Sequence, residues 1–174
     1  SLIVNLFGGP SAGKSTLAHG LMYHLKINGI ECEYASEYAK DLVFDYPGDI
    51  SVFKNQIEIY QEQRKRIFRY LNKVQVIVTD SPLPLFLYYE KSNNEEFHKK
   101  IMDEFNECNN LNFYLIRNHP YNSNGRYQDE NGANETHNSV KNILNNNSIF
   151  HYEVITGDKC LEYINEKIIA NLKI

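Results

Sequence analysis

The sequence has few cysteines and no excess of basic residues. Its three cysteines, Cys32, Cys108 and Cys160, are widely separated and odd in number. This distribution argues against a disulfide framework and a zinc site, and reduced, buried thiols are the expected state. The 18 basic residues are outnumbered by 22 acidic ones, which gives a net charge of -4. A protein of this charge lacks the broad basic face of a general duplex-DNA binder, although a local basic cleft is compatible with it.

The sequence also lacks a hydrophobic run long enough to span a membrane. Its first residues are typical of a core strand rather than a signal peptide, so we expect a cytoplasmic protein. The chain has 174 residues, of which 42% are hydrophobic. This is enough to build one domain with its own core, which we expect to cover residues 1–174.

One motif dominates what is present. Residues 8–16 read GGPSAGKST and match G-x-x-x-x-G-K-[ST] at every fixed position. An apolar run at 2–7 precedes the motif and a helical pattern at 17–25 follows it, which is the context of a phosphate-binding loop. We expect Lys14 to reach the β- and γ-phosphates of a nucleoside triphosphate and Ser15 to ligate Mg²⁺. The predicted nucleotide-binding residues are Gly8, Gly9, Pro10, Ser11, Ala12, Gly13, Lys14, Ser15 and Thr16. The alternative, a glycine-rich turn with a chance lysine, is disfavoured by the complete match.

Strand and helix patterns alternate along the rest of the chain. A helix is predicted to start with Ser36 as its N-cap, and a long polar helix is predicted over 50–71. This alternation predicts an α/β fold with a five-stranded, mostly parallel sheet and helices on both faces. The predicted strands cover 2–7, 31–35, 74–79, 111–116 and 150–155.

Charged residues follow three of these strands at the carboxyl ends, where parallel sheets bind their ligands. Asp80 ends the strand at 74–79, which is the place for a carboxylate that holds Mg²⁺ directly or through water. The alternative is an aspartate that only caps the next turn. The residue after Asp80 is Ser81, whereas ATPases of the helicase and AAA types usually have a water-activating glutamate there. This difference favours phosphoryl transfer to a substrate over hydrolysis.

Glu37 follows the second predicted strand, in a position that would face the acceptor of the phosphoryl group. A carboxylate there could orient the attacking hydroxyl or take its proton. An ordinary glutamate in the first turn of a helix, favoured by the helix dipole, is an equally good interpretation. Asp41 lies one turn further on and could share the role.

The segment 117–131 lies between a strand and a helix, is rich in glycine and asparagine, and has the character of a lid. Its Arg117 and Arg126 could close over the triphosphate and neutralise charge on the transferring phosphoryl group. A surface loop with two incidental arginines is the alternative.

These motifs together resemble a family. FGGPSAGKST at 7–16, EYAK at 37–40, TDSP at 79–82 and NSNGRYQDE at 122–130 are similar to small P-loop kinases of the ribosylnicotinamide-kinase-like group. The resemblance covers essentially the whole chain and is greatest to phage-encoded members often labelled "AAA family ATPase". It implies a three-layer P-loop fold with a five-stranded parallel sheet of nucleoside and nucleotide kinase type, an ATP donor and a lid arginine. It also implies a location in the host cytoplasm if the protein is phage-encoded.

The expected function is therefore an ATP- and Mg²⁺-dependent phosphotransferase. Its acceptor would be a nucleoside, a nucleotide or a related base-bearing hydroxyl. Related phage kinases phosphorylate 5-hydroxymethyluracil in DNA, which makes DNA an alternative substrate. The chain lacks the Asp-Arg pair that better-characterised nucleoside kinases have after the second or third strand, so the acceptor stays open. A nucleotide-dependent ATPase or switch acting on a protein partner is a further alternative.

Overall fold

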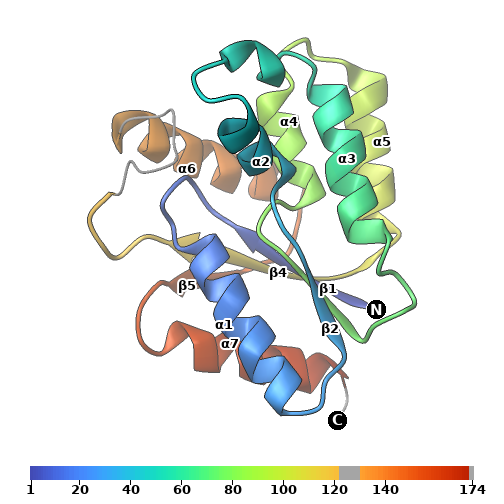
Figure 1. The fold of residues 1–174 in the computed structure, drawn as a ribbon, viewed down its shortest axis with the longest axis vertical. Helices are drawn as coiled ribbons and strands as arrows, with labels where there is room; N and C mark the ends of the chain where they lie inside the picture. Colours follow the sequence, from blue (N-terminus) through green and yellow to red (C-terminus); the bar gives the residue numbers. More distant parts are fainter. Residues whose placement is uncertain (122–129, 173–174) are drawn as a thin grey trace.

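A computed structural model describes residues 1–121 and 130–172. Five parallel strands form one sheet in the order β2-β3-β1-β4-β5 (Figure 1). The strands are β1 (Leu2–Phe7), β2 (Cys32–Ala35), β3 (Val76–Thr79), β4 (Asn109–Ile116) and β5 (Tyr152–Ile155). The helices are α1 (Lys14–Ile27), α2 (Tyr38–Asp45), η1 (Ile50–Phe53), α3 (Gln56–Phe68), η2 (Leu83–Leu85), α4 (Phe86–Tyr89), α5 (Glu95–Asn106), α6 (Glu130–Asn146) and α7 (Cys160–Leu172). The predicted five-stranded parallel sheet is confirmed.

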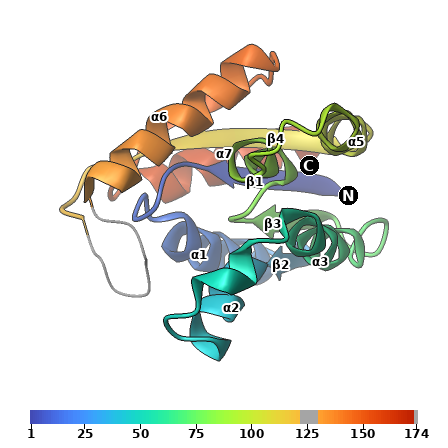
Figure 2. The same ribbon diagram turned by 90° about the horizontal axis from the view of Figure 1, so that it is seen from above.

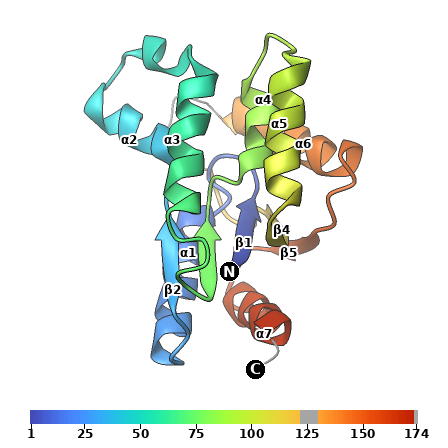
Figure 3. The same ribbon diagram turned by 90° about the vertical axis from the view of Figure 1, so that its right-hand side faces the viewer.

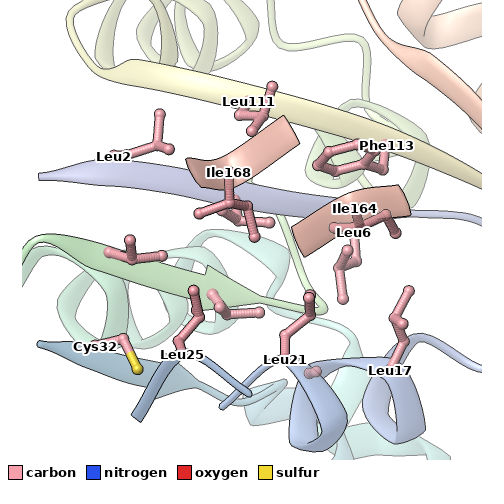
Figure 4. Close-up of a cluster of buried hydrophobic side chains, with 14 of the residues drawn as sticks. Leu2, Leu6, Leu17, Leu21, Leu25, Cys32, Leu111, Phe113, Ile164 and Ile168 are labelled. Atoms are coloured by element: carbon pink, nitrogen blue, oxygen red, sulfur yellow. The ribbon is translucent and has the colours of Figure 1, made fainter. Parts of the chain in front are cut away.

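The central strand β1 is buried along its whole length because helices cover both of its faces. Alternate residues of a strand point to opposite faces. On one face, Leu2, Val4 and Leu6 pack against α1 and α7 (Figure 4). In α1, buried leucines recur every fourth residue, at positions 17, 21 and 25, and form the stripe that contacts the sheet. This packing anchors the first turns of α1, and therefore the loop before it.

The other face of the sheet carries a larger helical layer. Ile3 and Ile77 pack there against α3, η2 and α5, and a neighbouring cluster joins Phe7 and Tyr114 to α6. Figure 2 shows α6 with its first turns beside the loop that joins β1 to α1. The protein is thus a three-layer sandwich. No helix in the two described ranges has the length and the apolar character needed to cross a lipid bilayer.

Two predicted helix boundaries were wrong. The second helix has Glu37 rather than Ser36 at its N-cap, and no side chain caps it. The predicted helix over 50–71 is a 3₁₀ turn, η1, followed by α3, which starts only after Asn55. Asn55 caps α3 because its side chain accepts a hydrogen bond from the Glu58 backbone N–H.

All five strands run in the same direction, so their carboxyl ends lie at one edge of the sheet. Figure 3 shows β1, β2 and β3 pointing toward this edge, with α2 and α3 beyond it. The 8–16 loop, Glu37, Asp80 and Arg117 each follow a strand there, as the sequence predicts.

Candidate active site

The loop between β1 and α1 has the backbone geometry of an anion-binding turn. Gly13 is the N-cap of α1 and adopts a left-handed conformation with φ of 82°. Ser11, which is buried, is also left-handed, with φ of 61°. A serine seldom adopts this conformation, and such backbone strain is typical of functional sites. When left-handed residues alternate with right-handed ones, successive backbone N–H groups point into the same concavity. Here that concavity lies at the positive end of the α1 dipole.

Lys14 begins α1 and folds back over this loop. Its Nζ donates to the carbonyl oxygens of Gly8 and Gly9, at 2.9 and 3.0 Å. The ammonium group is therefore held beside the loop that would carry the phosphates. A lysine in this position supplies a positive charge at short range to a bound β- or γ-phosphate.

The first turn of the loop packs directly against α6, a contact that sequence reasoning missed. A Cβ atom at Gly9 would lie 2.8 Å from the carbonyl oxygen of Ala133 and 2.9 Å from the Cβ of His137. Only a residue without a side chain fits such a close approach of two backbones.

Asp80 lies at the end of β3 and is 2% exposed. Its Oδ1 accepts a hydrogen bond from the backbone N–H of Glu37, at 3.1 Å. The Tyr34 hydroxyl also hydrogen-bonds to Asp80, and burial followed by this negative charge raises the pKa of Tyr34. The hydroxyl therefore remains a donor at physiological pH. These bonds fix the Asp80 carboxylate and join it to the turn that carries Glu37.

Gln63, on α3, holds the same turn from the other side. Gln63 is 1% exposed. Its Oε1 accepts a hydrogen bond from the Tyr38 N–H at 2.8 Å, and its Nε2 donates one to the Ser36 carbonyl at 3.3 Å. The two peptide groups that flank Glu37 are thus fixed by one buried amide. Sequence reasoning missed this role. The available signal was that Gln63 falls between Tyr60 and Ile67 on the apolar face of α3, where a glutamine needs polar partners.

Asp41, which the sequence offered as a partner for Glu37, is instead paired with Arg66. Arg66 also donates to the Ser36 hydroxyl at 3.2 Å, and its guanidinium lies over the ring of Tyr38. Asp41 therefore belongs to the support of the turn.

One cavity of about 380 Å³ joins the phosphate loop to Glu37. Residues 10–16 form one part of its lining. The rest of the lining combines charged, amide and aromatic groups, among them Glu37, Lys40, Phe53, Gln56, Phe86 and Tyr89. Ser81 also lines the cavity. The volume is in the range of small-molecule and cofactor pockets, which are mostly apolar with a few polar groups.

Arg117 follows β4 and extends along α6. Its Nη2 donates to Oε1 of Glu130 at 3.0 Å and to Oδ1 of Asn134 at 2.9 Å. Its Nη1 is buried and has no hydrogen-bond partner among the described residues. Such a donor is costly unless a ligand supplies an acceptor, and a phosphate oxygen is a suitable one. Arg126 lies outside the described residues, and Glu130 and Asn131, predicted as the end of the lid, belong to the first turn of α6.

A site for Mg²⁺ fits the residues at the loop. Ser15 stands in the first turn of α1 and Asp80 is buried at the end of the neighbouring strand β3. No cluster of three or more His, Cys, Asp or Glu suited to a metal occurs within 1–121 and 130–172. Mg²⁺ does not need one, because it binds through one or two protein oxygens together with phosphates and water.

Comparison with known proteins places the chain in a family. A family model described as an AAA domain matches residues 3–159, which is most of the chain. The chain belongs to this AAA-domain family. Among curated proteins, none matches the sequence.

Solved structures share the fold of this AAA-domain protein at low sequence identity. A thymidylate kinase from Ehrlichia chaffeensis has a TM-score of 0.65 at 13% identity over 98% of each chain. NadR protein in complex with NAD and AMP-PNP has a TM-score of 0.68 at 16% identity; the match covers 100% of this chain and 50% of NadR. Shikimate kinase from Acinetobacter baumannii in complex with shikimate has a TM-score of 0.51 at 16% identity over 98% and 92% of the two chains. The chain thus has a small P-loop kinase-like fold and spans about half the length of NadR.

Proposed function

We propose that the protein is an ATP- and Mg²⁺-dependent phosphotransferase that moves the γ-phosphoryl group to a nucleoside, a nucleotide or a related base-bearing hydroxyl. The observation that carries this proposal is the continuous cavity of about 380 Å³ between the phosphate loop and Glu37. A triphosphate donor and its acceptor would share this one space. A pure switch needs the phosphate loop but has no need for an aromatic-lined extension of the cavity beside it.

On the donor side, residues Gly8 to Thr16 would hold the triphosphate through backbone N–H groups and the N-terminus of α1. Lys14 would exchange its loop carbonyls for phosphate oxygens, and the buried Nη1 of Arg117 would donate a hydrogen bond to a phosphate oxygen. Ser15 and Asp80 would hold Mg²⁺, which bridges phosphates and neutralises the charge that develops during transfer. Most of the rate enhancement would come from positioning and charge neutralisation.

On the acceptor side, Glu37 is the carboxylate that lines the cavity. Its backbone is fixed by Asp80 and by Gln63, so its position relative to the Mg²⁺ site is set by the fold. We assign it the orientation of the attacking hydroxyl and the acceptance of its proton. Arg126 would add charge neutralisation from the 117–131 segment.

The residues that line the cavity beyond the phosphate loop support a planar, base-bearing acceptor. Phe53, Phe86 and Tyr89 supply aromatic surface, and Gln56 and Lys40 supply hydrogen-bonding groups. This mixture is typical of pockets that bind an aromatic ring and recognise its polar edge. The likeness to thymidylate kinase and NadR, at 13% and 16% identity, shows the fold alone, so the choice of acceptor rests on the lining of the cavity.

Steady-state consumption of ATP tests the proposal. We expect slow hydrolysis by the protein alone and a stimulation of at least tenfold by one acceptor from a panel of deoxynucleosides, nucleoside monophosphates and nicotinamide riboside. Stimulation only by DNA that contains 5-hydroxymethyluracil would identify a DNA-modification kinase. ATP consumption that no acceptor changes would contradict the proposal and favour an ATPase that acts on a protein partner.

A further inference from the structure

One face of α6 is directed at the phosphate site. Glu130, Asn134 and His137 are spaced by four and three residues, so they lie on one side of the helix. The first two accept hydrogen bonds from Arg117, and the third contacts the phosphate loop. The proposed function gives a role to the phosphate loop and to Arg117, but none to His137.

His137 is partly buried and held in a fixed position. Its ring stacks on that of Tyr114, with centroids 4.7 Å apart and an angle of 28° between the planes. The Tyr114 hydroxyl donates to the backbone carbonyl of His137, at 2.9 Å. The Nδ1 of His137 accepts a hydrogen bond from the backbone N–H of Gly9, at 3.4 Å. The two contacts with Tyr114 hold the imidazole ring, and the close packing of Gly9 on α6 holds the N–H group that faces it.

The geometry requires an uncharged ring. Nδ1 can accept from Gly9 only when it carries no proton, so the ring proton must be on Nε2. Burial and the positive charges of Arg117, Lys14 and Lys141 lower the pKa of His137, against a smaller opposite effect of Glu153 on β5. The cations come from the end of β4, the phosphate loop and α6 itself.

We propose that His137 is a positioning residue for the phosphate loop, whose ring nitrogen holds the Gly9 amide and thereby sets the place of the loop for a bound triphosphate. The inference rests on the proposed function only in taking the loop to bind a nucleoside triphosphate. His137 touches no reacting atom. It acts through Gly9, whose carbonyl is also one of the two that hold Lys14.

Two variants separate the hydrogen bond from the stacking. His137→Asn offers a side-chain oxygen near the place of Nδ1 but removes the ring, whereas His137→Phe keeps a flat ring on Tyr114 but removes the acceptor. His151→Phe is a matched control, because His151 also contacts the Tyr114 ring, at 6.1 Å between centroids, and its Nδ1 is bonded to Ile149 rather than to the loop. The readouts are the Kd for AMP-PNP by calorimetry, the thermal midpoint, and the backbone amide signal of Gly9 by NMR between pH 7.5 and 5.5.

We expect His137→Phe to raise the Kd for AMP-PNP about 3- to 10-fold, which is the range of one net hydrogen bond. His137→Asn should stay within about 2-fold of the wild type, and so should His151→Phe. The Gly9 signal should move with pH in the wild type and stay in place in His137→Asn. Equal effects of the Phe and Asn variants, or a Gly9 signal that ignores the protonation of His137, would overturn the inference. AMP-PNP binding needs no transfer, so a protein that follows this pattern but phosphorylates no acceptor would contradict only the proposed function.

Discussion

The contact between Gly9 and α6 yields the sharpest prediction about the loop. In Gly9→Ala, the new Cβ would lie 2.8 Å from the Ala133 carbonyl oxygen and 2.9 Å from the His137 Cβ. Ordinary van der Waals contact begins at about 3.4 Å, so the loop and the helix must separate by roughly 0.6 Å. Both neighbours belong to or adjoin the backbone of α6 and have no flexible end that can yield. Overpacking of this kind costs about 1–3 kcal/mol.

Because the separation displaces the phosphate loop itself, part of this cost should appear in nucleotide affinity. We expect the free energy of unfolding to fall by about 1–3 kcal/mol and the Kd for AMP-PNP to rise about tenfold, which corresponds to about 1.4 kcal/mol. Urea denaturation and calorimetry measure the two quantities.

Gly20→Ala is the matched control. The three atoms nearest to its Cβ would all belong to the Leu161 side chain, with the two Cδ atoms at 3.2 and 3.3 Å. The helix gains about 1 kcal/mol from replacing glycine by alanine. We expect unchanged AMP-PNP binding and little loss of stability. If Gly9→Ala were as stable as Gly20→Ala and bound AMP-PNP as tightly, the close packing of the loop on α6 would be refuted.

Three further predictions concern the site. Lys14→Ala should weaken triphosphate binding and lower the rate of phosphoryl transfer by about 10²–10³-fold, because it removes a preorganised charge at the phosphates. Single-turnover kinetics measures this rate, and an unchanged rate would contradict the role of Lys14. Gln63→Leu should destabilise the fold by about 1–3 kcal/mol because it leaves the Tyr38 N–H without its acceptor. It should also lower kcat more than it changes AMP-PNP affinity. A loss of stability with normal kcat would show that Gln63 does not position Glu37. The wild type should lose stability as the pH falls below about 6.5, because the pKa of His137 is lower in the folded state and the unfolded state therefore binds the proton first. Urea denaturation at pH 7.5 and 5.5 should show a smaller loss of stability in His137→Asn than in the wild type. Equal losses would contradict the lowered pKa.

Much of the fold could be predicted from the sequence because its signals are local. The strands stand out as apolar runs, and the phosphate loop is specified by glycines and Lys14 within a few residues. The errors also have local causes. Ser36 has the chemistry of an N-cap, but Arg66 engages its hydroxyl and Gln63 binds its carbonyl, so Glu37 takes the N-cap position. Tertiary partners thus override a capping signal that depends on one residue.

The site was predictable where a residue directly follows a strand, and not where it acts from another layer. Glu37 and Asp80 could be found because the carboxyl ends of parallel strands converge. For Gln63 the sequence shows only a glutamine on an apolar helix face, and for His137 it gives no signal, because their partners are peptide groups 25 and 128 residues away. For Arg117, the position was predictable but not its bonds to Glu130 and Asn134, which lie in the first two turns of α6.

Transfer of label from γ-labelled ATP tests the central claim most directly. The protein, with Mg²⁺, would be offered deoxynucleosides, nucleoside monophosphates, nicotinamide riboside, and DNA with and without 5-hydroxymethyluracil, with Lys14→Ala in parallel. The proposed function predicts label on one acceptor, transferred about 10²–10³-fold more slowly by Lys14→Ala. Label that appears only as free phosphate, in an amount that no acceptor changes, would contradict it.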